Sequence, residues 1–141
     1  FGKVNTQTIM QALPDVAKVQ GELSALQKQK ENDLKSMQDE LQRKADEYQK
    51  GASTMNATAK QQKETELQSL QQKFQQALQD AQQEMQKKQS ELMQPVYAKV
   101  TAAIEAVGKA GNYTYIFEEG AAVYAGTNVV DVTKEVQSKI K

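Results

Sequence analysis

The sequence carries two long runs of apolar residues at steps of mostly three or four, and this repeat constrains the fold more than any other feature. Such spacing places apolar side chains on one face of an α-helix. The first run comprises Val16, Val19, Leu23, Leu26, Leu34, Met37, Leu41, Ala45, Tyr48, Ala52 and Met55, and the second comprises Leu67, Leu70, Phe74, Leu78, Ala81, Met85 and Leu92. We therefore expect two amphipathic helices, each with a narrow apolar seam of the coiled-coil type.

A single stretch of small and polar residues separates the two runs, reading Gly51-Ala-Ser-Thr-Met-Asn-Ala-Thr58. Residues of this kind favour a turn, so the two helices are expected to pair antiparallel. The sequence thus predicts a helical hairpin arm over residues 21–94 with its tip near residues 51–58. Lys30 falls on the seam between Leu26 and Leu34, and we expect weaker pairing there because the seam is otherwise apolar.

Cap residues and prolines mark where helices are expected to begin and end outside the two apolar runs. Phe1 to Asn5 suits a short strand, and Asn5 or Thr6 offers an N-cap for a short helix that Pro14 should end, with Asp15 capping the next helix. Pro95 removes one backbone donor and is expected to kink or restart the return helix.

Beyond residue 107 the period changes from that of a helix to that of a strand. Gly108 and Gly111 suit a helix C-terminus. Aromatic residues at 113, 115 and 117 then alternate with Thr114, Ile116 and Glu118, as in a strand. Glu119-Gly120 turns into Ala121–Ala125, which predicts a β-hairpin. Residues 129–132 form another apolar segment, and Thr133 suits the N-cap of a closing helix. We expect an α+β fold, mostly α, in which residues 1–20 and 95–141 form a β-containing base.

Two or three short strands with open edges are unstable in water, so the base is expected to need partner chains. We predict a symmetric homo-oligomer joined through Val4, Tyr115, Phe117 and Val123.

Charge and composition exclude several classes of function. Lys plus Arg and Asp plus Glu number 18 each, so no net field attracts nucleic acid or an anionic membrane. The chain has no His and no Cys, which removes the commonest general base, thiolate nucleophiles and most metal ligands. It also lacks a phosphate-binding glycine loop. We therefore expect no catalytic residues, no cofactor and no metal.

Two residue groups have competing interpretations. Tyr113, Tyr115 and Phe117 suit a stacking platform for single-stranded RNA, but without interleaved basic residues a core or interface role is favoured. The methionines suit either coiled-coil packing or an adaptable binding surface. Met37, Tyr48 and Met55 are our candidates for binding a protein client, Met55 in particular because it lies at the tip.

Three segments of the chain are distinctive. They are Gly2-Lys-Val-Asn-Thr-Gln-Thr-Ile9 followed by Pro14, Lys87-Lys-Gln-Ser-Glu-Leu-Met-Gln-Pro95, and Tyr113-Thr-Tyr-Ile-Phe117 through Val130-Asp-Val-Thr133. With these segments the chain resembles the Skp/OmpH family of periplasmic chaperones for outer-membrane proteins. The resemblance spans nearly the whole chain and implies a trimer whose strands form a small β-barrel.

The resemblance also implies a periplasmic protein whose signal peptide has been removed, and which holds unfolded outer-membrane β-barrel chains between its arms without ATP. One departure concerns lipid: several family members are strongly basic, whereas this chain is neutral with a pI near 6.6, which argues against capture of lipopolysaccharide by charge.

A structural or adaptor coiled coil that binds a folded partner or a membrane surface is the alternative function. Suppression of aggregation of an unfolded barrel protein separates the two, because only a chaperone protects such a chain.

Overall fold

The computed structural model describes residues 1–140, which form two compact units. Phe1–Glu22 and residues 89–140 make up one unit, here called the base, and Leu23–Lys88 make up the other, here called the arm. The elements follow the order β1 (Gly2–Val4), α1 (Thr6–Ala12), α2 (Pro14–Gly51), the 3-10 helix η1 (Ala52–Thr54), α3 (Ala57–Ala110), β2 (Ile116–Glu118), β3 (Val130–Asp131) and α4 (Thr133–Lys139). The predicted mostly helical α+β fold is confirmed.

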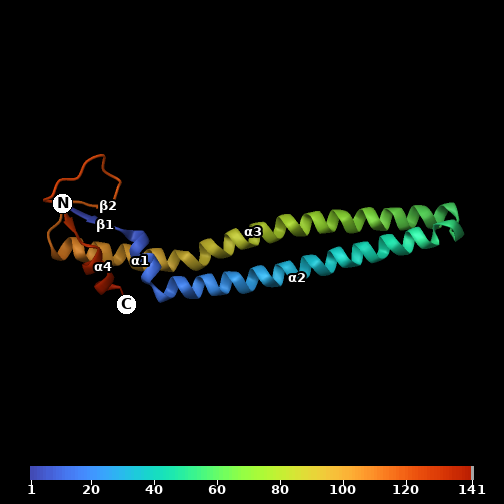
Figure 1. Cartoon of the computed structure of the whole chain (residues 1–141), viewed down its shortest axis with the longest axis horizontal. Helices are drawn as coiled ribbons and strands as arrows, with labels where there is room; N and C mark the ends of the chain where they lie inside the picture. Colours follow the sequence, from blue (N-terminus) through green and yellow to red (C-terminus); the bar gives the residue numbers. More distant parts are fainter. Residues whose placement is uncertain (141) are drawn as a thin grey trace. The chain divides into compact units, whose positions relative to one another are not determined.

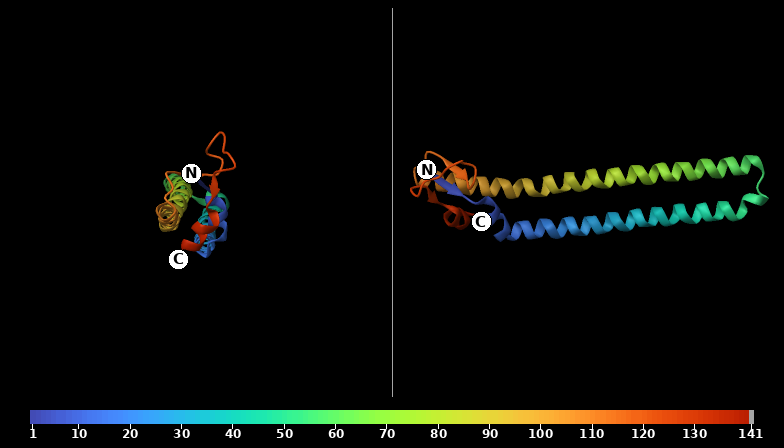
Figure 2. Two further views of the ribbon diagram at one scale, coloured as in Figure 1. Left: turned by 90° about the vertical axis from the view of Figure 1, so that its left-hand side faces the viewer. Right: turned by 45° about the horizontal axis from the view of Figure 1, so that its top comes forward.

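Within the arm, α2 and α3 lie side by side and run in opposite directions (Figures 1 and 2), which confirms the predicted hairpin. Seam residues such as Leu34, Leu41 and Phe74 are half-buried between the helices, as the apolar repeat predicts. Leu78 is an exception, because it is 42% exposed. Ala77 takes the seam position instead, three residues after Phe74 and four before Ala81.

The two arm helices are joined by ion pairs as well as by apolar contacts. Lys30 pairs with Glu84, and Lys44 Nζ lies 2.6 Å from Glu66 Oε1. The polar break expected at Lys30 is therefore bridged by a carboxylate from the opposite helix. The Lys30 side chain is 26% exposed, which is consistent with a long cationic side chain that packs its stem against apolar neighbours.

The chain reverses through η1. Thr54 Oγ1 donates to the carbonyl of Gly51 at 2.9 Å, and the amide of Met55 donates to the carbonyl of Ala52 at 3.4 Å. Asn56 then caps α3, since its Oδ1 accepts from the amide of Ala59 at 2.8 Å. Local side-chain bonds thus satisfy backbone groups that the two helix ends leave free.

The base sheet has the order β2-β1-β3 with both pairs parallel. β1 lies in the middle: the amide of Gly2 donates to the carbonyl of Tyr115 at 2.9 Å, and the amide of Val132 donates to the carbonyl of Lys3 at 2.9 Å. The predicted β-hairpin is wrong, because residues 121–125 form no strand and β2 pairs with β1 instead. β2 therefore pairs with a strand from the other end of the chain and not with the segment that follows it in sequence.

The base core is built from small aliphatic side chains. It contains Val4, Ile9, Val100, Ala103, Val107, Val132 and Val136, with Met10, Leu13, Ile104, Tyr113, Ile116 and Ile140 packed against it. Ile9 and Val136 are fully buried. The core therefore joins β1, α1, the last turns of α3 and α4.

The predicted cap of α1 is confirmed, whereas the start of α2 and the helix around Pro95 differ from the expected ones. Asn5 caps α1, accepting from the amide of Thr8 at 3.0 Å, but α2 already begins at Pro14, where proline is well tolerated. α3 continues through Pro95, because the packing of Val96 and Val100 outweighs one lost hydrogen bond.

At the C-terminal end of α3, Asn112 and not a glycine adopts the left-handed conformation, with φ 54°. The amide of Tyr113 donates to the carbonyl of Gly108 at 3.0 Å, and that of Asn112 to the carbonyl of Lys109 at 3.4 Å. This pair of bonds is the Schellman motif, for which asparagine is an accepted substitute for glycine.

A polar junction joins the two ends of the chain at α4. Thr133 is the first residue of α4 and not its cap: its amide and its hydroxyl donate to Asp131 Oδ1 at 3.0 and 2.6 Å. Thr133 Oγ1 in turn accepts from the amide of Asn5 at 3.0 Å. These bonds from Thr133 lower the pKa of the Asp131 carboxyl.

We predict that Asp131→Ala lowers the free energy of unfolding by about 1 kcal/mol, because two hydrogen bonds at the start of α4 are lost. The lowered pKa means that this carboxylate stabilises the fold above its unfolded pKa, and that the effect disappears as pH falls through its folded pKa. The variant should therefore also lose part of the acid sensitivity of the wild type.

Thermal and urea unfolding followed by circular dichroism, at one protein concentration, measures both effects. Asp131→Asn keeps an acceptor and should lose less stability, and Asp33→Ala on exposed helix surface should lose almost none. Equal losses for Asp131→Ala and Asp33→Ala would contradict the role of the junction.

A second prediction concerns Lys30 in the arm seam. Lys30→Leu should stabilise the arm by about 1 kcal/mol, because an apolar side chain fills the seam and Glu84 is left at the surface, where it stays solvated. Lys35→Leu is the control, since Lys35 forms only an exposed pair with Asp39. Hydrogen exchange of α2 amides reports the change, and faster exchange in Lys30→Leu would show that the ion pair is the stronger contribution.

Candidate functional site

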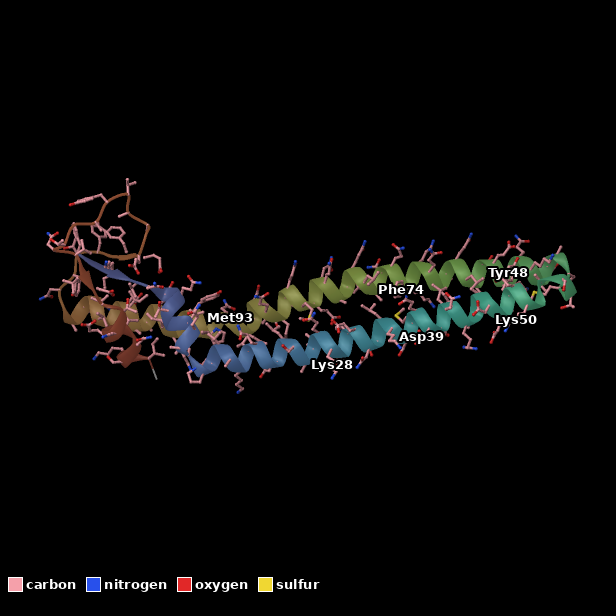
Figure 3. All side chains as sticks on the ribbon, in the orientation of Figure 1. Lys28, Asp39, Tyr48, Lys50, Phe74 and Met93 are labelled. Carbon is pink, nitrogen blue, oxygen red and sulfur yellow. The ribbon has the colours of Figure 1, made fainter. Side chains whose placement is uncertain are left out.

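Two of the three candidate client-binding residues lie together near the tip of the arm. Tyr48 from α2 and Met55 from the turn line a pocket of about 270 Å³, together with Lys44, Glu47, Lys63, Glu66 and Leu67. Tyr48 lies close to the tip end of α2 (Figure 3), whereas Lys28 lies farther along the same helix. Met37 is half-buried in the seam and does not line this pocket.

A cross-helix hydrogen bond holds the Tyr48 ring in place. The Tyr48 hydroxyl donates to Glu64 Oε1 at 2.6 Å, and this bond raises the pKa of the phenol. The phenol is thus a fixed donor, and its ring presents an apolar face beside Met55 and Leu67.

Charged groups complete the walls of the pocket. The Lys44–Glu66 hydrogen bond raises the pKa of Lys44 and lowers that of Glu66, so both partners remain charged at neutral pH. Lys63 Nζ lies 3.6 Å from the other oxygen of Glu66. Two lysines therefore face two glutamates, and the pocket combines apolar walls with balanced charge.

The sequence contains a signal for these contacts that the apolar repeat does not reveal. Lys44 and Glu66, like Tyr48 and Glu64, lie at nearly equal distances along the chain from the turn. In an antiparallel hairpin such positions face each other. Complementary residues placed symmetrically about a turn could therefore have identified the pocket walls.

The base carries a second surface of interest, made of exposed apolar side chains. Tyr115, Phe117 and Val123, three of the candidate interface residues, are 58%, 46% and 108% exposed. The rings of Phe1 and Tyr115 have centroids 5.8 Å apart, and those of Tyr115 and Phe117 are stacked at 5.6 Å. Aromatic contacts of this geometry keep the three side chains in one row.

Val4 must be corrected as an interface candidate. It is only 3% exposed and packs in the core of its own chain, so its side chain cannot reach a partner. The face of β1 that was expected to point outward is the buried one. Phe1 and Tyr124, which are 66% and 84% exposed, are apolar residues of this surface that the strand pattern did not indicate.

The same surface encloses a hollow of about 490 Å³, lined among others by Phe1, Phe117, Tyr124 and Val129. The outer edges of β2 and β3 have no strand beside them among residues 1–140. Exposed aromatics next to open edges mark a surface suited to another protein chain.

Two kinds of feature are absent from residues 1–140. They contain no group of three or more His, Cys, Asp or Glu residues arranged to hold a metal ion. No helix within residues 1–140 has the length and apolar character needed to cross a membrane.

Comparison with known proteins gives a fold match and a family match. The chain is similar to the crystal structure of a candidate outer membrane chaperone (OmpH-like) from Caulobacter crescentus, with a TM-score of 0.85 and 18% sequence identity, over 99% of this chain and 82% of that one. No curated protein matches the sequence. The family model "Outer membrane protein (OmpH-like)" matches residues 1–140. The chain therefore belongs to the OmpH-like family.

Proposed function

We propose that this protein is an ATP-independent holding chaperone of the periplasm, which binds unfolded outer-membrane proteins and prevents their aggregation. The observation that carries the proposal is the arm-tip pocket, where Tyr48, Met55 and Leu67 offer apolar surface within a ring of balanced charge. The family membership, and the fold shared with a solved candidate outer membrane chaperone, support it.

The physical properties of the pocket suit a holding function. A pocket of about 270 Å³ accepts a single side chain and not a folded surface. Burying one aliphatic or aromatic side chain contributes about 1.5–3 kcal/mol at most, so each contact is weak and breaks quickly. Release then needs no nucleotide, because folding of the client removes the exposed side chains.

Weak contacts retain a client only when several act together. We propose that the chain forms a homotrimer through the base, with Tyr115, Phe117 and Val123 in the interface and the sheets combined into a small barrel. The exposed aromatic row and the open edges of β2 and β3 support this arrangement. Three arms would raise the local concentration of binding sites and increase the overall affinity.

Aggregation of an unfolded barrel protein tests the function. We expect the wild type to suppress light scattering of a barrel protein diluted from urea, and Met55→Asp or Tyr48→Asp to weaken binding about tenfold by placing a charge among apolar walls. Ser53→Asp in the exposed turn is the control. Full scattering in the presence of wild-type protein would refute the chaperone function and favour an adaptor coiled coil.

Sedimentation and static light scattering of the protein alone test the oligomer. Phe117→Asp should dissociate it, because three carboxylates would meet at the interface, whereas Thr114→Asp, also exposed but polar already, should leave the mass unchanged. Circular dichroism must show that both variants remain helical. A mass of three chains in Phe117→Asp, or a monomeric wild type, would contradict the interface.

A further inference from the structure

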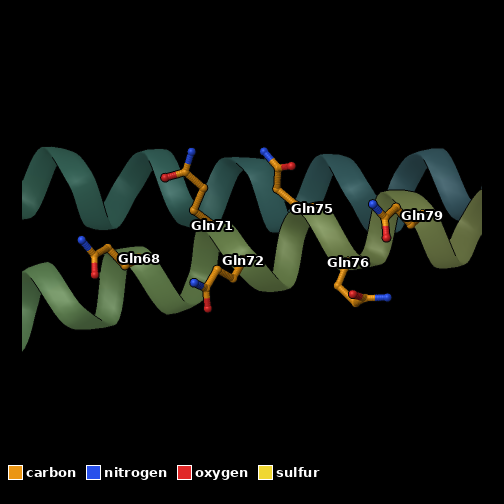
Figure 4. A pocket seen from close by; sticks show the side chains of 6 residues that line it. All are labelled: Gln68, Gln71, Gln72, Gln75, Gln76 and Gln79. Atoms are coloured by element: carbon orange, nitrogen blue, oxygen red, sulfur yellow. The ribbon is translucent and has the colours of Figure 1, made fainter.

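One face of α3 consists almost entirely of glutamine. Gln68, Gln71, Gln72, Gln75, Gln76 and Gln79 line an open hollow of about 760 Å³ (Figure 4), which we call the glutamine face. The six residues form two rows with a step of four, one through Gln68, Gln72 and Gln76 and one through Gln71, Gln75 and Gln79. Residues four apart are neighbours on a helix surface, so each row is continuous.

The glutamine face differs from ordinary solvated helix surface. Lys73 is the only charged residue from Leu67 to Gln79, whereas the equally long stretch of α2 from Lys35 to Glu47 has seven. Charged side chains on α2 form ion pairs at the surface, such as Arg43 with Glu47. Solubility alone would be served equally well by charges on α3, so their replacement by amides needs another explanation.

Most of these amides are available for binding. Only Gln76 has an intramolecular side-chain bond among the six, with its Nε2 donating to Asp80 Oδ1 at 2.9 Å. Each remaining side chain offers donors and an acceptor to the solvent. Leu78, which is 42% exposed, lies three residues after Gln75 and adds an apolar contact at the border of the face.

We propose that the glutamine face binds the peptide backbone of an unfolded chain in extended conformation. Each row repeats about every 6 Å along the helix, and an extended chain repeats its backbone groups on one edge about every 6.6–6.8 Å. Flexible side chains absorb this difference over the two repeats that each row of three side chains spans. The peptide group is itself a neutral amide with one donor and one acceptor, so it is the complement of an uncharged glutamine row.

This recognition rests on the proposed holding function and defines its chemistry. Hydrogen bonds to backbone groups do not depend on the client's side chains, so they suit clients of unrelated sequence. Because each one replaces a bond to water, its net contribution is small and it exchanges readily. The contact is also insensitive to salt, unlike contacts between charged surfaces.

A charge-neutral substitution tests the proposal. The variant Gln68→Glu, Gln72→Lys, Gln75→Glu, Gln79→Lys removes four amides, keeps the net charge, and places each new carboxylate four residues before a new ammonium group, which stabilises the helix. We expect its affinity for a urea-denatured outer-membrane barrel protein to fall about tenfold at low and at high salt. Gln38→Glu with Gln42→Lys makes the same exchange at the same spacing on α2, outside the glutamine face. This control should bind like the wild type.

A second measurement examines the backbone directly. The wild type should bind a neutral extended peptide more tightly than the same peptide with N-methylated backbone amides, whereas the four-site variant should bind both alike. Equal binding of the two peptides by the wild type would overturn the proposal.

The outcomes separate the two proposals. A wild type that binds no unfolded barrel protein overturns the holding function and this inference with it. A wild type that binds, with unchanged affinity in the four-site variant, overturns the glutamine face alone. A smaller sedimentation mass for the four-site variant would also overturn it, because the face would then join copies of this chain.

Discussion

The base depends on the pairing of β1 with two strands from the far end of the chain. β1 has only three residues, yet it bonds to β2 on one edge and to β3 on the other, at a sequence separation of more than one hundred residues. Such distant pairing carries a large loop-closure cost. The buried core of Val4, Ile9, Val132 and Val136 and the Asn5–Thr133–Asp131 bonds offset it at the same place. Closing the base brings together the two chain segments from which α2 and α3 continue.

The arm is stabilised differently, by side chains that are half-buried and never fully enclosed. Its seam alternates aliphatic contacts with cross-helix bonds, including Lys30 to Glu84, Lys44 to Glu66 and Tyr48 to Glu64. An apolar seam alone allows neighbouring registers, since many of its residues are interchangeable. Each polar pair forms only in one register, so these pairs specify alignment more than they add stability. The tip pocket is a direct product of that alignment.

The sequence predicted what local patterns determine. The seam spacing indicated both arm helices, and Asn5 was identified as a cap because capping uses neighbouring residues. The parallel sheet was not predicted, because the period from Tyr113 to Phe117 shows a strand but not its partner. Val4 was wrongly assigned to the interface for a similar reason, because tertiary packing decides which face of an alternating strand is buried. Of the candidate site, Tyr48 and Met55 were identified from the sequence. Lys44, Glu66 and Leu67 were not, because only the pairing of α2 with α3 brings them to the pocket.

Between residues 35–47 of α2 and residues 67–79 of α3 the polar chemistry differs, and this difference fits the proposed holding function, in which clients are bound without being trapped. On α2, charged side chains satisfy one another in pairs such as Lys35 with Asp39, which leaves them less available to a client. On α3, uncharged amides from Gln68 to Gln79 have few intramolecular partners. A charged binding face would favour clients of one sign and would release them slowly at low salt. In the proposed binding mode, an amide face would bond to the backbone that all unfolded chains share, and it would compete with water on nearly equal terms.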